Sequence, residues 1–285
     1  MKSLKILIGV LVVLAAIYTI VTIGTEKKSK PKPFFPRFSK EAARKIYLKG
    51  TQKETVIERK EDVWIVTSED SLPADMQTLE TMFEKVASFS RKDIVSTNPE
   101  KFSIYKVDTT GIRVVFEGEA GDTLASLIVG KVGPDYQSTY IRNTLTDEVI
   151  LAPGYVRPVF DRGARTWQDK RIFALQPDEI VEVRVKRPDE EVVILRDKER
   201  NWYISEPESA ACKIDRVSRL VRTIAYLRCE DFAGRAPIPD SGVDSPDSLI
   251  AFKTRDGIEH TLVFGSQGEQ KRIYTKKNDS DIVYL

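Results

Sequence analysis

Apolar and polar residues alternate in short runs along most of this chain, and twice the alternation gives way to a helical stripe. Alternation places every second side chain on one face and therefore predicts half-buried strands. In the first half, we expect strands at residues 46–48, 55–57, 63–66, 112–116, 124–129, 138–142 and 148–151. After the third of these, apolar residues recur at the spacing of one helix face: Leu79, Met82, Phe83, Val86 and Phe89. This spacing predicts an amphipathic helix that packs on the sheet.

The same order of elements returns in the second half of the chain. Residues 64–66 (WIV) recur as 202–204 (WYI), and residues 127–130 (LIVG) recur as 262–265 (LVFG). The offset falls from 138 residues between Trp64 and Trp202 to 133 residues between Ile150 and Val283. The second helical stripe comprises Val217, Leu220, Val221, Ile224 and Leu227. A period this long is typical of tandem domains rather than of a solenoid.

We therefore predict an α+β protein with an N-terminal transmembrane helix followed by two tandem repeats. Each repeat is expected to be a mostly antiparallel β-sheet with one long amphipathic helix. The predicted segments are a membrane anchor (1–25), a basic proline-rich stalk (26–42), repeat 1 (43–152), an inter-repeat connector (153–178) and repeat 2 (179–285). Each repeat is long enough to bury a core of its own.

The predicted anchor is the apolar stretch at residues 4–24. A helix of about 20 apolar residues spans the hydrocarbon core of a bilayer. A cleaved signal peptide is the alternative, but its apolar region would be shorter. No cysteine comes directly after the stretch, so a lipoprotein is excluded. We expect a single-pass protein in bacterial inner-membrane lipid.

Charge is distributed unevenly along the chain. Residues 1–50 carry a net charge of +9, and the remaining residues carry −7. The mildly acidic repeats argue against a nucleic-acid partner. The basic stalk favours repeats in the cytoplasm, although large C-terminal domains can translocate regardless of such charges.

The sequence contains no recognisable catalytic constellation. His260 is the one histidine, and Cys212 and Cys229 flank the second predicted helix, too far apart for a disulfide. This inventory excludes the usual His/Cys zinc site and a G-x-S-x-G nucleophile, and no phosphate-binding glycine motif is present. We therefore predict a non-enzymatic protein with no cofactor and no metal.

The most distinctive polar segment is residues 133–142, GPDYQSTYIR. Repeat 2 keeps a tyrosine and a basic residue here but replaces the residues before them. The difference is compatible with loop drift or a structural turn, and also with a site confined to repeat 1. The hypothetical partner-contact surface comprises Tyr136, Gln137, Tyr140, Arg142, Tyr155 and Arg157.

Several segments together resemble a known family. They are residues 98–102 (NPEKF), 124–131 (LASLIVGK), 133–142 (GPDYQSTYIR) and 167–170 (WQDK). They closely resemble the domain-of-unknown-function 4340 family. The resemblance implies a bacterial membrane-anchored protein of repeated α+β modules, facing the periplasm. Genes of such proteins often accompany those of an exporter-type ABC permease, its ATPase and a gliding-motility-like auxiliary protein. The resemblance implies no catalytic residues.

We therefore expect an envelope protein that acts as a non-catalytic accessory or scaffold for an ABC transporter complex. The alternative is a membrane-anchored periplasmic glycan-binding protein or hydrolase that uses the region from Tyr136 to Arg157. A third possibility is a cytoplasmic scaffold whose basic stalk lies on anionic lipid.

Overall fold

The computed structural model describes residues 11, 13–16, 18, 32–50 and 54–285. Within these residues, no helix is both long enough and apolar enough to cross a membrane. Most of the predicted anchor at residues 1–25, and the first part of the predicted stalk, lie outside the described residues.

Repeat 1 is built on a nine-stranded antiparallel sheet in the order β4-β3-β2-β1-β6-β7-β8-β9-β5. Its strands are β1 (Lys45–Lys49), β2 (Thr55–Lys60), β3 (Val63–Val66), β4 (Leu72–Pro73), β5 (Ile94–Ser96), β6 (Ile112–Glu117), β7 (Thr123–Val132), β8 (Ser138–Asn143) and β9 (Val149–Pro153). All the strands that the alternation predicted are present. The two edge strands, β4 and β5, have no counterpart in the prediction.

Repeat 2 has a second nine-stranded antiparallel sheet, ordered β13-β12-β11-β10-β15-β16-β17-β18-β14. Its strands are β10 (Ile180–Arg187), β11 (Glu190–Arg196), β12 (Trp202–Glu206), β13 (Ala210–Ala211), β14 (Phe232–Arg235), β15 (Ser248–Thr254), β16 (Glu259–Gln267), β17 (Ile273–Lys277) and β18 (Ile282–Tyr284). Each strand occupies the place of its counterpart in the first sheet. The two halves of the chain are therefore copies in topology as well as in sequence.

One long helix packs on a single face of each sheet. In repeat 1 it is α2 (Met76–Ser88), which begins where the Asp75 carboxylate accepts a hydrogen bond from the Thr78 amide at 2.9 Å. An aspartate at this position satisfies a helix amide that otherwise has no partner. The apolar stripe of α2 joins the inward-facing residues of the sheet in one buried cluster that includes Ile46, Leu48, Ile57, Val66, Val114 and Phe116. The helix of repeat 2 is α6 (Ile214–Ala225), whose stripe packs with Val183, Ile194, Phe252 and Leu262.

The core of repeat 1 begins earlier in the chain than the sequence indicated. Phe34 and Phe35, which the prediction placed in the stalk, are 1% and 4% exposed and belong to this core. The Phe34 amide donates to the Phe89 carbonyl at 2.9 Å, which ties the segment to the end of α2. The proline and basic residues around these phenylalanines predicted a solvent-exposed segment. The two aromatic rings instead pack in the core with residues of α2.

The connector contains the short helices α4 (Arg157–Phe160) and α5 (Ala164–Trp167). Its side chains are shared between the two cores. Phe160 and Trp167 are buried in the core of repeat 1, whereas Ile172 and Phe173 are buried in that of repeat 2. The connector is therefore a packed element and not an extended linker.

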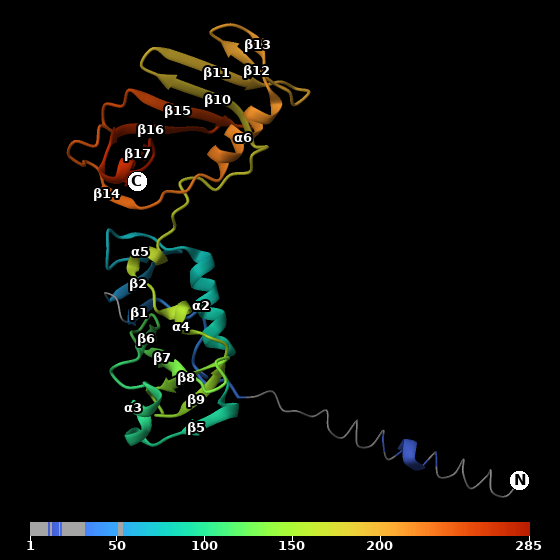
Figure 1. The fold of residues 1–285 in the computed structure, drawn as a ribbon, viewed down its shortest axis with the longest axis vertical. Helices are drawn as coiled ribbons and strands as arrows, with labels where there is room; N and C mark the ends of the chain where they lie inside the picture. The colour runs from blue at the N-terminus through green and yellow to red at the C-terminus, as the bar shows by residue number, and fades with distance from the viewer. Residues whose placement is uncertain (1–10, 12, 17, 19–31, 51–53) are drawn as a thin grey trace, which may run out of the picture.

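The two repeats meet at the turn between β3 and β4. Leu72 of repeat 1 is fully buried and belongs to the core of repeat 2. Around it, the Arg165 guanidinium bridges Glu69 and Asp231, with N–O distances of 3.3 and 2.7 Å. Figure 1 places the repeats one above the other with α5 and the connector at their junction.

Candidate functional site

The sheet of repeat 1 has one covered face and one open face. Alternate residues of β1 and β6 are buried beneath α2, and the residues between them point to the opposite side. The helix α3 (Phe102–Tyr105) covers only part of that opposite side, where Phe102 and Val107 pack with Ile128 and Val149. The remainder of this open face is accessible to a ligand or partner.

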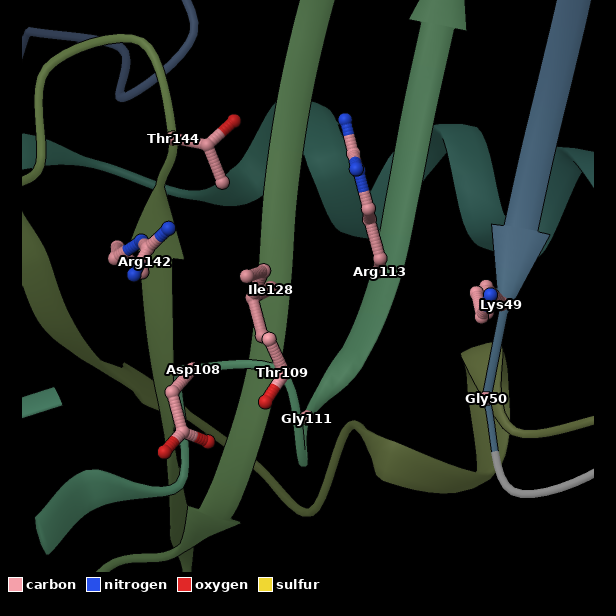
Figure 2. Close-up of a pocket in the computed structure, with 9 residues that line it drawn as sticks. All are labelled: Lys49, Gly50, Asp108, Thr109, Gly111, Arg113, Ile128, Arg142 and Thr144. Atoms are coloured by element: carbon pink, nitrogen blue, oxygen red, sulfur yellow. The ribbon is translucent and has the colours of Figure 1, made fainter. Parts of the chain in front are cut away.

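Four residues form a row across the open face because their strands are paired in register. Lys49 of β1 lies opposite Arg113 of β6, and Arg113 lies opposite Ile128 of β7. Ile128 in turn lies opposite Arg142 of β8. Directly opposed residues of antiparallel strands point to the same face. Three cationic side chains therefore share one side of the sheet, and Figure 2 shows them with a helix behind the strands. We call Lys49, Arg113 and Arg142 the cationic row.

Arg142 is the most constrained member of the cationic row. Its guanidinium carbon lies 4.2 Å from the centre of the Phe102 ring, and its side chain is 16% exposed. Its Nε atom is buried without a hydrogen-bond partner among the described residues. Its nearest carboxylate, that of Asp147, lies 3.9 Å away. Burial lowers the pKa of Arg142, and the charge of Arg113 lowers it further, whereas Asp147 and Asp108 act in the opposite direction.

Arg113 occupies the centre of the cationic row and is exposed. Among the described residues, no hydrogen bond or ion pair to its guanidinium is found. Lys49 differs, because its ammonium lies 2.7 Å from Glu54 Oε1. That hydrogen bond raises the pKa of Lys49, and the charge of Arg113 opposes the rise. Arg113 thus repels both of its neighbours in the row.

The cationic row borders a hollow of about 580 Å³. The remaining lining residues are Gly50, Asp108, Thr109, Gly111, Ile128 and Thr144. This volume is in the range of small-molecule sites. The hollow therefore offers cationic donors, the Thr109 hydroxyl group and a small apolar floor at Ile128.

The loop that carries Asp108 is held against the sheet by close backbone packing. A Cβ atom on Gly111 would lie 2.3 Å from Ile128 Cγ2 and 2.7 Å from the Lys106 carbonyl oxygen. The Asp108 carboxylate accepts hydrogen bonds from the Thr110 amide and hydroxyl, at 3.0 and 2.6 Å. The hydroxyl bond makes the largest contribution to lowering the pKa of Asp108. Asp108 is thus an ionised carboxylate at a fixed place beside the row.

Repeat 2 carries a modified version of the same row. Strand pairing aligns Lys186, Leu249, Val263 and Lys276 across β10, β15, β16 and β17. The outer cations are kept, but leucine replaces the central arginine. Lys276 lies 3.4 Å from Asp244, the counterpart of Asp108. On the same face, Arg184 lies 3.8 Å from Glu182 and 3.0 Å from Glu191. The open face of repeat 2 is therefore largely neutralised by its own carboxylates.

The residues of the predicted contact surface do not form one patch. Tyr136 is 84% exposed in the turn before β8, and Tyr155 is 57% exposed. The Gly154 amide donates to the Gln137 carbonyl at 2.6 Å, so Tyr136, Gln137 and Tyr155 lie at the same end of the β8–β9 pair.

The other members of the set point elsewhere. Tyr140 and Arg142 lie on the open face, where the Tyr140 ring packs 4.7 Å from that of Tyr105. Arg157 lies on α4, on the covered side, and its guanidinium is 3.3 Å from Asp161. Arg142 is the member that the structure places in the cationic row. A contact role for the set stays a prediction.

The remaining candidate groups occupy structural positions. His260 stacks on Phe252 with ring centres 4.9 Å apart and has Phe173 at its edge. Cys212 and Cys229 are both free. Burial raises the pKa of Cys229 to about 11, so its thiol is protonated at neutral pH. Within the described part of the chain, no three His, Cys, Asp or Glu residues gather as a metal site would require.

Comparison with known proteins agrees with the resemblance seen in the sequence. Residues 64–246 match the family described as a domain of unknown function, DUF4340. The chain belongs to the DUF4340 family. The matched region runs from β3 through the loop before β15, so it includes α2, the connector and the junction between the repeats. No curated protein and no solved structure matches the chain.

In this DUF4340 protein, sequence reasoning identified Arg142 of the cationic row and missed Lys49 and Arg113. Both residues are charged residues in strands where apolar and polar residues alternate. This pattern is typical of any solvent-facing strand position, so it did not single them out. A comparison of the two repeats could have identified Arg113, because repeat 2 has leucine, Leu249, at the equivalent position.

Proposed function

We propose that this DUF4340 protein is a non-catalytic accessory protein of a membrane transport complex of the ABC exporter type. The N-terminal apolar stretch holds it in the inner membrane, and the two repeats bind the partner on the periplasmic side. The apolar stretch and the family resemblance support the membrane setting and the class of partner. The open sheet faces support a role in binding.

The observation that carries this proposal is the junction between the repeats. Leu72 of repeat 1 is buried in the core of repeat 2, and Arg165 bridges carboxylates of both repeats. Arg235 of β14 also donates to the Ser71 carbonyl at 3.0 Å. Contacts of this kind fix the orientation of one sheet relative to the other. A partner therefore meets two sheet faces in a constant relative position, as a scaffold requires.

Affinity purification from native membranes, followed by mass spectrometry, tests the proposal. The expected result is recovery of an ABC permease and its ATPase with the full-length protein. A Leu72→Asp variant, which places a charge in the junction, should recover less of both. Exposed Leu145→Asp is the matched control and should recover wild-type amounts. Absence of both subunits in several detergents would contradict the proposed partner.

Topology is tested separately, because the basic stalk and the family resemblance predict opposite orientations. Cys212 is partly exposed and Cys229 is buried, so a membrane-impermeant maleimide should react mainly with Cys212. Labelling in intact spheroplasts is expected for periplasmic repeats. Labelling only after lysis would place the repeats in the cytoplasm.

A glycan-binding role is the second candidate, and the exposed tyrosines favour it. Tyr136 and Tyr155 are both more than half exposed at one end of the β8–β9 pair. Exposed aromatic rings provide an amphipathic surface for such contacts. Binding of the purified protein to peptidoglycan or other envelope glycans, lost in the Tyr136→Ala/Tyr155→Ala double variant, would support this role.

A further inference from the structure

We propose that the cationic row of repeat 1 is a binding site for a phosphoryl group, with Arg113 as its central ligand. The site is independent of the transport partner proposed above, because it is argued from the open face of one repeat. The ligand class is a phosphate monoester or diester, whether in a soluble compound or in a lipid headgroup.

The first argument is the register of the strands. Lys49, Arg113 and Arg142 project from β1, β6 and β8 at one level of the sheet. Neighbouring strands lie about 4.8 Å apart, so the Cα atoms of Arg113 and Arg142 are separated by roughly 10 Å. Long arginine side chains can span that gap from both sides and meet at one anion above Ile128.

The second argument is the uncompensated charge at the centre of the row. Lys49 has Glu54 at 2.7 Å, and Arg142 has Asp147 at 3.9 Å. Arg113 has no such partner among the described residues, and its charge acts against the protonated forms of both Lys49 and Arg142. An anion bound beside Arg113 would replace this repulsion by attraction to all three groups.

The third argument is the way in which Arg142 is held. The Phe102 ring lies 4.2 Å from its guanidinium carbon, and little of the side chain is exposed. Its Nε donor is buried without a hydrogen-bond acceptor. A guanidinium fixed in this way loses little conformational entropy when it binds. Because Arg142 also lines the hollow, its fixed guanidinium is placed to donate to a ligand there.

The geometry favours a phosphoryl group over a carboxylate. One arginine satisfies a carboxylate through two parallel hydrogen bonds, whereas phosphate oxygens point in several directions and accept from several donors. The row provides donors from three strands, and Thr109 adds a hydroxyl group to the lining of the hollow. Asp108 has one oxygen engaged by Thr110 and lies on the Arg142 side of the hollow. Glu54 and Asp147 accompany the two outer cations, and Arg113 is the member of the row without a carboxylate partner among the described residues.

Repeat 2 is a natural comparison for the proposed site. Leu249 occupies the position of Arg113, between Lys186 and Lys276. Lys276 has its own carboxylate partner in Asp244 at 3.4 Å. The proposal therefore assigns one phosphoryl site to the chain, in repeat 1. Arg113→Leu converts the row of repeat 1 to the pattern of repeat 2, and Leu249→Arg makes the reverse change.

Calorimetric titration of the full-length protein in a phosphate-free maltoside detergent tests the proposal with inorganic phosphate as the probe. Ionic strength is held constant with chloride. The expected result is saturable binding of one phosphate, with a dissociation constant raised at least tenfold by Arg113→Leu. Arg219→Leu, which removes an exposed arginine from α6, is the charge-matched control and should leave the constant within twofold. Leu249→Arg should add a second site.

Arg113→Gln is a second variant for the case in which the leucine variant fails to fold. Circular dichroism and the unfolding temperature without phosphate establish that each variant is folded. Absence of saturable binding, or equal loss in the Arg113 and Arg219 variants, would overturn the proposal.

The source of the phosphoryl group is distinguished with nanodiscs. Stronger binding to nanodiscs that contain phosphatidic acid than to pure phosphatidylcholine nanodiscs, lost in Arg113→Leu, assigns a lipid headgroup. Equal binding to both kinds of nanodisc that Arg113→Leu leaves unchanged, together with saturable binding of free phosphate, assigns a soluble ligand. Retained phosphate binding without recovered transporter subunits contradicts only the proposed function. Recovered subunits without phosphate binding contradict only this site.

Discussion

The Arg235 guanidinium of repeat 2 donates a hydrogen bond to the Ser71 carbonyl of repeat 1, at 3.0 Å. Arg235 is also paired with Asp281, 2.7 Å away in its own repeat. One side chain therefore connects the turn before β18 with the turn that precedes Leu72 and β4. The junction combines this polar contact with the buried leucine beside it, and it makes the stability of each repeat depend on the other.

Leu72→Ala should destabilise repeat 2 although the substitution lies in repeat 1. Removing a fully buried leucine side chain costs about 2–5 kcal/mol, because apolar contacts are lost and a cavity remains. The free energy of unfolding, measured in urea, should fall by this amount, and unfolding should separate into two transitions. Leu145→Ala, at a 56% exposed position, should change it by less than about 0.5 kcal/mol. A single unshifted transition in Leu72→Ala would exclude the predicted coupling.

Gly111→Ala and Gly121→Ala should destabilise repeat 1 for different reasons. At Gly111 the added methyl group overlaps Ile128 and the Lys106 carbonyl, which costs about 1–3 kcal/mol. At Gly121 the space is open, and the cost of about 1 kcal/mol comes from a φ of +77°. In a background that carries Ile128→Ala, which removes the overlapping Cγ2 atom, the loss at Gly111 should be smaller and the loss at Gly121 unchanged. Denaturant unfolding of the two glycine variants, Ile128→Ala and the two double variants measures this, and equal relief at both glycines would contradict the assigned overlap.

Stability should fall in alkaline solution partly because of Cys229. Burial raises the pKa of its thiol from 9.0 to about 11, so the folded state holds this proton more tightly than the unfolded state does. The stabilisation is complete below pH 9.0 and is lost as the pH rises toward about 11. The unfolding free energy of wild type should decline more steeply across this range than that of Cys229→Ala. Parallel profiles for the two proteins would show that Cys229 does not contribute.

Tyr136→Ala should leave the fold intact. The side chain is 84% exposed, so the unfolding free energy should change by less than about 0.5 kcal/mol. If the predicted contact role is real, partner or glycan binding should weaken without a change in unfolding temperature. Tyr140→Ala is the useful contrast, because its ring packs on Tyr105 and its loss should lower stability. Unchanged binding by Tyr136→Ala would remove this residue from any contact surface.

Strands and helices with a long periodic pattern were predictable from the sequence. The stripe from Leu79 to Phe89 identified α2, and duplication located its counterpart α6. Strand β5 and the three other edge strands were missed because two to four residues are too few to establish a period. Phe34 and Phe35 were misassigned since the surrounding prolines and lysines dominated the composition of their segment.

The candidate site required information that local patterns do not contain. Lys49 and Arg113 are 64 residues apart in the sequence and become neighbours only through the pairing of β1 with β6. Their register depends on the whole hydrophobic pattern of both strands. Arg142 was identified because its segment differs between the repeats. The same comparison applied to position 113 and Leu249 would have identified the centre of the row.

Each sheet ends in very short strands: β4 and β13 have two residues, β5 has three and β14 has four. Another chain can pair with a long exposed edge strand through backbone hydrogen bonds and so extend the sheet. Very short edge strands offer too few unpaired backbone groups for this pairing. The duplicated architecture thus presents two broad sheets without the tendency to polymerise that such sheets would otherwise carry. The side chains on the sheet faces therefore determine which partners bind. A single substitution there, such as leucine in place of arginine, can change this selectivity.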